Sequence, residues 1–401
     1  MNITGIITEY NPFHLGHKLH LEKAKEDTNC DGVICIMSGN FMQRGMPALI
    51  DKWTRAKIAV LNGVDLVIEL PLIYSLSSAE GFANGAVKIL TESKVTNNLY
   101  FGSEHGVIDD LLKISDTLTY EDSEFQSLLK TEVNKGLPFH TARMLALQDF
   151  LPDINCNDIL NNSNNILAIE YLKALSRNNS NIKPYTLKRC GADYNEKEIK
   201  TSFPSATSIR NMLETEGDLN KLKNSVTHET FGVMNELIST NYSLVYPEKM
   251  FQFIKYKLLT EGYKLKNIKE ASEGLDNKIL KEISNSSSLD EFILNIKSKR
   301  YTYTRINRIL TSFFIGLENY DLSNIVKNNP SYIRPLAFNS KGSKILKEIK
   351  KNSDLDIITK LPKSISNEIL NLDILGTKAY SILNNSISPY EDYLKSPIYL
   401  P

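Results

Sequence analysis

The sequence predicts an α/β protein with a Rossmann-like, doubly wound parallel sheet, a helical insertion and an all-helical C-terminal domain. Strand-like and helix-like segments alternate three times from the N-terminus. The strand segments are nearly continuous apolar runs, as expected for strands covered on both faces. Polar turns follow them, at the sheet edge where such folds bind ligands. We expect a catalytic domain at residues 1–215, with the insertion at about 107–160, and a C-terminal domain at 216–401.

The first strand and helix are predicted within residues 2–20, NITGIITEYNPFHLGHKLH. An isoleucine-rich strand ends at Asn11-Pro12, and His14 and His17 open a helix. The N-terminus of a helix offers free backbone N–H groups and a positive dipole end, which suit an anion. Two imidazoles three residues apart share one helical face, and Gly16 lets a ligand approach the backbone between them. The simplest ligand for this pattern is a nucleoside triphosphate.

Further strand segments follow at Asp31–Met37, Val64–Leu70 and Asn98–Phe101, and at the partly polar Ile182–Lys188. The last contains a proline and is expected at or near an edge of the sheet. The intervening segments favour helices, among them one at Ser75–Thr91 and one for which Ser163 is a plausible N-cap. The segment from about 107 to 160 lacks strand signals, which predicts the helical insertion.

Beyond Glu216 the sequence predicts helices only. The strongest is the amphipathic segment Ser298–Leu317, whose core face includes Ile306, Ile309 and Phe313. We expect a loop at Ser331–Gly342.

Composition is that of an ordinary globular protein: 401 residues, 41% hydrophobic, 23% charged, with a formal net charge of zero. The charge is uneven, because residues 251–350 hold 18 Lys/Arg against 10 Asp/Glu. This asymmetry suggests a basic module joined to a neutral or acidic catalytic one.

The four cysteines have no C-x-x-C spacing, so we expect free thiols in a reducing compartment and no zinc site. The sequence shows no signal peptide and no apolar run of membrane-spanning length. Together these features predict cytoplasmic localisation.

The first candidate site combines His14, Gly16 and His17 with the hydroxyl-rich segment Ser205–Arg210. Imidazolium N–H groups, hydroxyls, an arginine and a helix N-terminus are donors suited to adenylyl transfer from ATP, where charge develops on phosphate oxygens. Structural or surface histidines and a plain helix cap with a surface arginine are the alternative.

The second candidate site is the turn Ser38-Gly39-Asn40 with the basic residues after it. The turn ends a central strand, so it should face the ligand cleft. For Lys52 and Arg55 a solvated helix face, and for Trp53 a place in the core, are as good an interpretation as contact with a ligand. The residues that flank the turn are Gln43, Arg44, Lys52, Trp53 and Arg55.

The third candidate site gathers groups that can read adenine and ribose edges. They are Gly102, Ser103, Glu104, Asn164, Asn165 and Arg189. Glu104 could also help to hold a magnesium ion through the triphosphate.

The fourth candidate site is the basic helix near residue 300, where cationic side chains alternate with tyrosines. This pattern suits RNA phosphates and unstacked bases, although a solvated basic helix edge fits equally well. The residues are Lys297, Lys299, Arg300, Tyr301, Tyr303, Arg305 and Arg308.

These motifs carry a resemblance. His-x-Gly-His after the first strand resembles the signature of the nucleotidylyltransferase superfamily, which includes class I aminoacyl-tRNA synthetases, and SATSIR resembles that superfamily's segment for the β- and γ-phosphates. The wider set of motifs is similar to the bacterial tRNA(Met) cytidine acetate ligases, mainly over residues 1–213. In order, the motifs are EYNPFHLGH, MSGNFMQRG, DKWTRAKIAV, DLVIELP, FGSEHG, NNIL and SATSIR.

The resemblance implies a nucleotidylyltransferase-type sheet and an enzyme that activates acetate with ATP to acetyl-adenylate. It then acetylates N4 of the wobble cytidine of elongator tRNA(Met). Catalysis is assigned to His14, His17 and Arg210. The chain departs from the family's pattern at two positions: Ser163 stands where the family usually has a proline, and Ala168 stands where it usually has a glycine. These departures affect where the helix starts and which asparagine faces the nucleotide.

ATP, with Mg²⁺ on its triphosphate, is expected to contact a set that starts at the first strand. The set is Ile7, Thr8, Glu9, Tyr10, Asn11, Pro12, Phe13, His14, Leu15, Gly16, His17, Lys18, Leu19, His20, Gly102, Asn165, Arg189, Ser205, Thr207 and Ser208. Acetate and tRNA are assigned to Ser38, Gly39, Asn40, Arg44, Lys299, Arg300, Arg305 and Arg308.

Two other functions fit the same motifs. One is a small-molecule adenylyltransferase, in which AMP stays on the product; the basic helical tail argues against it. The other is a nucleotide-binding protein without chemistry, which the presence of both histidines disfavours.

Overall fold

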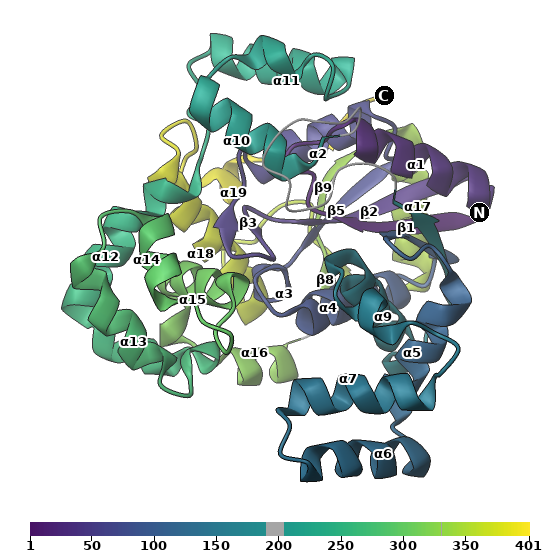
Figure 1. Ribbon diagram of the computed structural model, residues 1–401. Helices are drawn as coiled ribbons and strands as arrows, with labels where there is room; N and C mark the ends of the chain where they lie inside the picture. The colour runs from purple at the N-terminus through teal and green to yellow at the C-terminus, as the bar shows by residue number, and fades with distance from the viewer. Residues whose placement is uncertain (190–203, 330) are drawn as a thin grey trace.

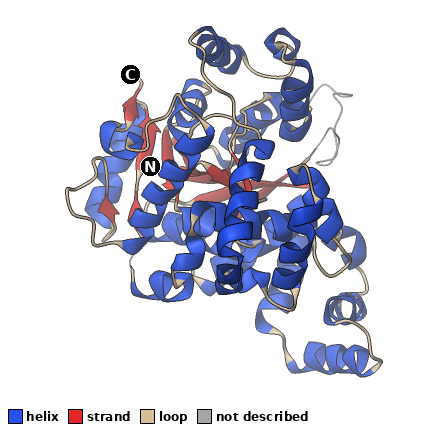
Figure 2. Cartoon of the chain, turned by 90° about the vertical axis from the view of Figure 1, so that its left-hand side faces the viewer, coloured by secondary structure: helices blue, strands red, loops and turns tan. Residues whose placement is uncertain are grey.

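A mostly parallel sheet with helices on both faces forms the centre of the computed structural model, which describes residues 1–189, 204–329 and 331–401 (Figure 1, Figure 2). Among the described residues, the sheet has seven strands in the order β11-β9-β5-β2-β1-β6-β7. They are β1 (Ile3–Thr8), β2 (Gly32–Ser38), β5 (Leu66–Leu70), β6 (Asn98–Ser103), β7 (Lys183–Lys188), β9 (Pro335–Phe338) and β11 (Ile398–Tyr399). This confirms the predicted doubly wound sheet.

Parallel register brings the carboxyl ends of the first strands to one edge. β1 pairs with β2 from Ile3 opposite Gly32 to Thr8 opposite Met37. β5 continues the sheet beside β2, and β6 and β7 continue it beyond β1, all parallel. The turns that follow these strands therefore share one edge, as the sequence predicted.

Side chains of each buried strand alternate between two cores, because successive residues of a strand point to opposite faces. In β2, Val33 and Cys35 join the core on one face of the sheet, whereas Ile34 and Ile36 join the core on the other face. Continuous apolar runs thus correctly predicted strands that are covered by helices on both faces.

Helices make up most of the rest of the chain. Those of the first part are α1 (Leu15–Thr28), α2 (Lys52–Leu61), α3 (Leu72–Ser75), α4 (Ala79–Glu92), α5 (Ile108–Tyr120), α6 (Ser123–Asn134), α7 (Phe139–Phe150), α8 (Cys156–Leu160), α9 (Ser163–Arg177) and α10 (Ala206–Glu216). Those beyond are α11 (His228–Ser239), α12 (Phe251–Glu261), α13 (Leu275–Glu282), α14 (Leu289–Ile296), α15 (Tyr303–Ile315), α16 (Leu322–Asn328), α17 (Ser340–Asn352), α18 (Glu368–Leu383) and α19 (Glu391–Leu394). Helices α5–α8 form the expected insertion.

Two predicted helices have different limits. The segment Ser75–Thr91 is split, because Ser78 accepts a hydrogen bond from Gly81 and starts α4 anew. The basic helix begins only at Tyr303, where Thr302 caps α15, and it ends at Gly316 in the left-handed region (φ 101°). At α9 the capping position is Asn162, one residue before the expected Ser163.

The expectation of an all-helical C-terminal part is wrong. The predicted loop Ser331–Gly342 contains β8 (Tyr332–Ile333) and β9 and starts α17. β9 lies antiparallel beside β5, and β11 pairs with β9. The described residues also form two small two-stranded sheets. One pairs β8 with β10 (Asp356–Ile357), and the other is the hairpin of β3 (Phe41–Met42) and β4 (Met46–Pro47). The central sheet therefore contains strands from both sides of residue 215, where the sequence predicted a domain boundary.

A buried network of charges ties the C-terminal segments to the first part of the chain. Lys52 Nζ lies 2.7 Å from a Glu69 oxygen and 2.9 Å from Asp392. Arg334 contacts the same two carboxylates at 3.2 and 3.0 Å. All four side chains are at most 3% exposed. Such a network is costly to break, because removing one partner leaves a buried charge uncompensated.

The described helices include none long and apolar enough to cross a membrane. Cys30, Cys35 and Cys156 are free thiols, as predicted. Cys190 and residues 202–203 of the predicted turn Ser202–Arg210 lie outside the described residues.

Candidate active site

The turn after β1 places the two predicted catalytic histidines face to face. His14 is the N-cap of α1, and its Nδ1 accepts a hydrogen bond from the backbone N–H of Gly16 at 3.1 Å. The Nδ1 of His17 accepts from the backbone N–H of His14 at 3.3 Å. The two rings stack with centroids 3.7 Å apart. A reciprocal capping box thus fixes both imidazoles.

Both histidines are neutral rather than the imidazolium ions that the sequence predicted. Burial, with Arg189 and Arg210 nearby, lowers the pKa of His14 to about 3. Burial and the neighbouring His14 and Arg189 hold the pKa of His17 well below its usual value. Since each Nδ1 accepts a backbone hydrogen bond, the ring proton of each belongs on Nε2. The site therefore presents two neutral Nε2–H donors at the N-terminus of α1.

This pKa shift makes stability sensitive to acid. His14 has a pKa of about 3 in the folded protein against 6.5 for the free side chain, so the unfolded chain binds the extra proton between those values. Stability is therefore lost as pH falls from 6.5 towards 3. We expect His14→Asn, which keeps a capping side chain, to reduce the loss in unfolding free energy between pH 7 and 5 by about 2 kcal/mol. Urea titrations at both pH values measure it; an unchanged pH dependence, equal to that of the exposed-residue control His228→Asn, would contradict it.

Arg210 joins the start of α10 to the histidine turn. Its Nη1 donates to the carbonyl of Asn11 at 2.7 Å, and its Nη2 lies 3.1 Å from Thr207 Oγ1. Ser205 is the N-cap of α10 and accepts from the N–H of Ser208. The helix start and the arginine predicted from SATSIR are thus brought to His14, although 191 residues separate Ser205 from that histidine in the sequence.

Arg189 approaches the same turn from the end of β7. A Cβ on Gly102 would lie 3.2 Å from Arg189 Cγ, so the glycine leaves room for the arginine to cross it. Burial, together with the nearby Arg189, lowers the pKa of His20 to about 4. His20 packs edge-on against Tyr100, with ring centroids 5.2 Å apart. His14, His17, His20 and Arg189 therefore form one cluster, and their contact with ATP stays a prediction.

The asparagines predicted to read the nucleotide hold the fold together here. Asn165 is buried; its Oδ1 accepts from the N–H of His105, and its Nδ2 donates to Ile159. The carboxylate of Glu104 accepts from both N–H groups at the start of α9, those of Asn164 and Asn165. Glu104 therefore caps α9, and contact of Asn165 with the nucleotide stays a prediction.

The turn Ser38–Asn40 is buried and shaped by Arg55. The guanidinium of Arg55 donates to the carbonyls of Ser38 and Gly39, and also to Glu9. Asn40 accepts from the backbone N–H of Lys52 at 2.8 Å. Lys52, Trp53 and Arg55 are thus structural, and contact of the Ser38–Asn40 turn with acetate stays a prediction.

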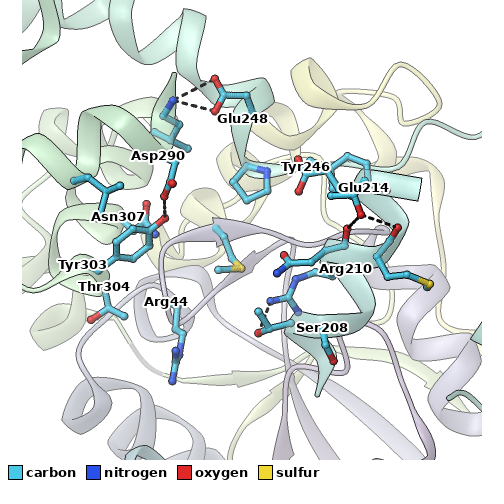
Figure 3. A pocket seen from close by; sticks show the side chains of 18 of the residues that line it. Arg44, Ser208, Arg210, Glu214, Tyr246, Glu248, Asp290, Tyr303, Thr304 and Asn307 are labelled. Atoms are coloured by element: carbon cyan, nitrogen blue, oxygen red, sulfur yellow. Dashed lines mark hydrogen bonds between the residues drawn. The ribbon is translucent and has the colours of Figure 1, made fainter. Parts of the chain in front are cut away.

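A large cavity opens beside α10, and sequence reasoning did not find it. Its volume is about 1230 Å³, and it lies between α10 on one side and α14 and α15 on the other (Figure 3). Arg44 of the β3–β4 hairpin lines it, as do Arg210 and the predicted phosphate segment. The sequence held one signal for this cavity: Glu214 follows Arg210 by one helical turn, which places both side chains on the same face of a helix.

Comparisons with known proteins identify the family of the chain. A family model described as HIGH Nucleotidyl Transferase matches residues 1–393. The tRNA(Met) cytidine acetate ligases of Clostridium novyi and Clostridium perfringens are each 50% identical to the chain, over 100% and 99% of both sequences respectively. The chain belongs to the tRNA(Met) cytidine acetate ligase family of HIGH nucleotidyl transferases.

Solved structures agree with this family. A crystal structure of Thermotoga maritima TmcAL bound with alpha-thio ATP has a TM-score of 0.88 and 32% sequence identity, covering all of both chains. The apo form of TmcAL from the same organism gives a TM-score of 0.90 at 33% identity. The resemblance drawn from the motifs is confirmed over the whole chain, beyond the first 213 residues on which it mainly rested.

Within this acetate ligase, the described residues contain no group of three or more His, Cys, Asp or Glu side chains that could hold a metal ion. Glu104 is occupied as a helix cap.

The basic residues assigned to tRNA are partly paired. Arg305 donates to the carbonyl of Glu270, and Arg308 pairs with the Glu270 carboxylate at 3.1 Å. Arg300 lies 3.3 Å from Glu273. Lys299 is exposed. Lys299 and Arg300 lie in the turn before α15 rather than on the helix predicted for them.

Proposed function

We propose that this ligase activates acetate with ATP and transfers the acetyl group to N4 of the wobble cytidine of elongator tRNA(Met). The observation that carries the proposal is the pair of Nε2–H donors, His14 and His17, beside Arg210 at one helix N-terminus. This chemistry also fits the name of the curated relatives, tRNA(Met) cytidine acetate ligase.

In the first step, an acetate oxygen attacks the α-phosphorus of ATP. The bond from that phosphorus to the bridging oxygen breaks, and pyrophosphate leaves with the electron pair. His14, His17 and Arg210 stabilise the charge on the phosphate oxygens. Ser205, Thr207 and Ser208 at the start of α10 hold the β- and γ-phosphates. A Mg²⁺ ion carried by the triphosphate would neutralise part of its charge.

The second step needs the adenylate, because the exocyclic amine of cytosine is a poor nucleophile. The target base has to leave the anticodon stack to reach the sheet edge. We assign tRNA binding to residues 216–401, with Lys299 and Arg300 among the phosphate contacts. The reaction is placed in the cytoplasm, where ATP and tRNA meet.

The test is direct. Protein, ATP, labelled acetate and unmodified tRNA(Met) transcript are incubated, and the digested RNA is searched for N4-acetylcytidine. Label in that nucleoside, dependent on ATP, is the expected result. An unlabelled RNA, together with ATP–pyrophosphate exchange that depends on another small acceptor, would favour a small-molecule adenylyltransferase.

Salt dependence tests the assignment of the basic turn. Neutralising Lys299 and Arg300 (both to Gln) should remove two phosphate contacts, which lowers the slope of log affinity against log salt by about 1.5. Filter binding of tRNA(Met) between 50 and 200 mM salt, roughly the range in which such contacts show, measures this slope. The control Lys130→Gln, on the exposed face of α6, should leave it unchanged. Equal slopes for wild type and the double variant would remove this turn from the RNA interface.

A further inference from the structure

The cavity beside α10 is suited to a nucleoside. Its volume of about 1230 Å³ is at or above the upper end of typical small-ligand pockets, of roughly 300–1000 Å³. Arg210 and Ser208 line it, so it is continuous with the site assigned to adenylyl transfer. Tyr246 and Tyr303 supply aromatic side chains, on which bases can stack. An acceptor placed here would lie beside Arg210, which the proposed mechanism assigns to the charge on the phosphate oxygens.

Glu214 stands apart among the carboxylates that line this cavity. Asp290 accepts from the hydroxyl of Tyr303 at 3.0 Å, and Glu248 accepts from the backbone N–H of Leu289 at 2.9 Å. Glu216 pairs with Lys221. In the part of the chain that the structure describes, the Glu214 carboxylate makes no hydrogen bond or ion pair. It is therefore available to a ligand.

The position of Glu214 is set by the helix that carries Arg210. The two residues are four apart on α10, so their side chains leave the same face about 5–6 Å apart at Cβ. Figure 3 shows both on one side of the cavity, with Tyr303 and Asn307 on the other. The proposed mechanism assigns Arg210 to the adenylate, so a carboxylate one turn away on the same face of α10 would lie close to an amine that attacks it.

We propose that the cavity receives the extruded target cytosine and that Glu214 accepts a proton from its N4 amine during acetyl transfer. This role rests on the proposed function and identifies a residue for its second step. A carboxylate accepts hydrogen bonds from cytosine N4 and repels the O4 oxygen of uracil. The same contact thus orients the amine and selects cytidine over uridine.

Acetyl transfer joins the cytosine amine to the acetyl group of the adenylate. N4 forms a bond to the acetyl carbonyl carbon, and the bond from that carbon to the AMP oxygen breaks. AMP leaves with the electron pair, and one of the two N4 protons passes to Glu214 and then to solvent. Partial burial and the nearby Glu248 raise the pKa of Glu214 above its usual value, against the opposing effect of Arg210. A raised pKa makes this carboxylate a better proton acceptor near neutral pH.

Glu214→Gln separates the two steps of the reaction. The substitution keeps size and removes the proton acceptor, and thermal melting checks that the variant is folded. We expect acetate-dependent ATP–pyrophosphate exchange within about threefold of wild type, and kcat for N4-acetylcytidine formation to fall about 100-fold or more. The acid limb of the pH profile for acetyl transfer should disappear. Glu214→Asp should retain that limb with a lower rate, and Glu229→Gln, on the exposed face of α11, should match wild type.

Three results would overturn this role. In the first, Glu214→Gln transfers acetyl within about threefold of wild type. In the second, exchange and transfer fall in parallel, which places Glu214 in the activation step. In the third, melting shows Glu214→Gln unfolded while Glu214→Asp is folded and fully active with an unchanged pH profile. A wild-type protein that makes no N4-acetylcytidine overturns the proposed function and, with it, this role.

Discussion

Replacing His14 and His17 together by alanine is expected to slow acetate-dependent ATP–pyrophosphate exchange by about 10³-fold or more. In the proposed mechanism each ring supplies one N–H donor to the oxygens of the reacting phosphate, and removing one such donor typically costs 10²- to 10³-fold. The two rings stack at 3.7 Å and form one unit, so the effects of single substitutions should not add. Binding of tRNA should be unchanged, because the basic turn lies elsewhere.

The exchange assay with labelled pyrophosphate measures this loss, and tRNA filter binding serves as the internal control. His140→Ala and His228→Ala change exposed histidines on α7 and α11 and should leave both readouts at wild-type levels. Exchange by the double variant within tenfold of wild type would remove the histidine pair from the chemistry. Arg210 would then be the main candidate for charge stabilisation.

The largest stability effect is expected at Arg334. Replacing it by methionine leaves Glu69 and Asp392 facing each other with Lys52 as their common cation. Breaking a buried ion pair in this way costs about 3–5 kcal/mol. Urea denaturation at pH 7 measures the loss in unfolding free energy.

A matched substitution shows whether burial is the cause. Arg300 pairs with Glu273 near the surface at 3.3 Å, and its side chain is 63% exposed. Arg300→Met should therefore cost about 1 kcal/mol or less. Equal losses for Arg300→Met and Arg334→Met would mean that desolvation plays no part in the network.

The parts of the fold that the sequence predicted are those coded by neighbouring residues. The alternation of apolar runs and amphipathic helices placed β1, β2, β5, β6 and β7, and the proline after Asn11 placed the histidine turn. The hydroxyls before Arg210 marked the start of α10. In each case the deciding contacts, such as the caps at His14 and Ser205, lie within three residues of the motif.

The rest depends on partners far along the chain. The strand β9 is four residues long and starts at a proline, so its local pattern resembles a loop. It becomes a strand because it pairs with β5. Glu69 inside an apolar strand was a signal for a buried charge, but nothing near it identifies Arg334 or Asp392. The protonation of His14 was predicted wrongly for a similar reason, since its pKa is set by burial and by two distant arginines.

The pairing of β9 with β5 has a consequence for how the chain is made. Val67 lies opposite Ala337, so 270 residues separate two partners in one ladder. A ribosome releases the histidine turn, β1 and β2 early, but β5 keeps an open edge until residue 338 has emerged. Such open edges invite pairing with other chains, and late long-range pairing slows folding. The nascent chain therefore carries the histidine turn on an unfinished sheet for most of its synthesis, with β5 as an exposed edge that chaperones can protect.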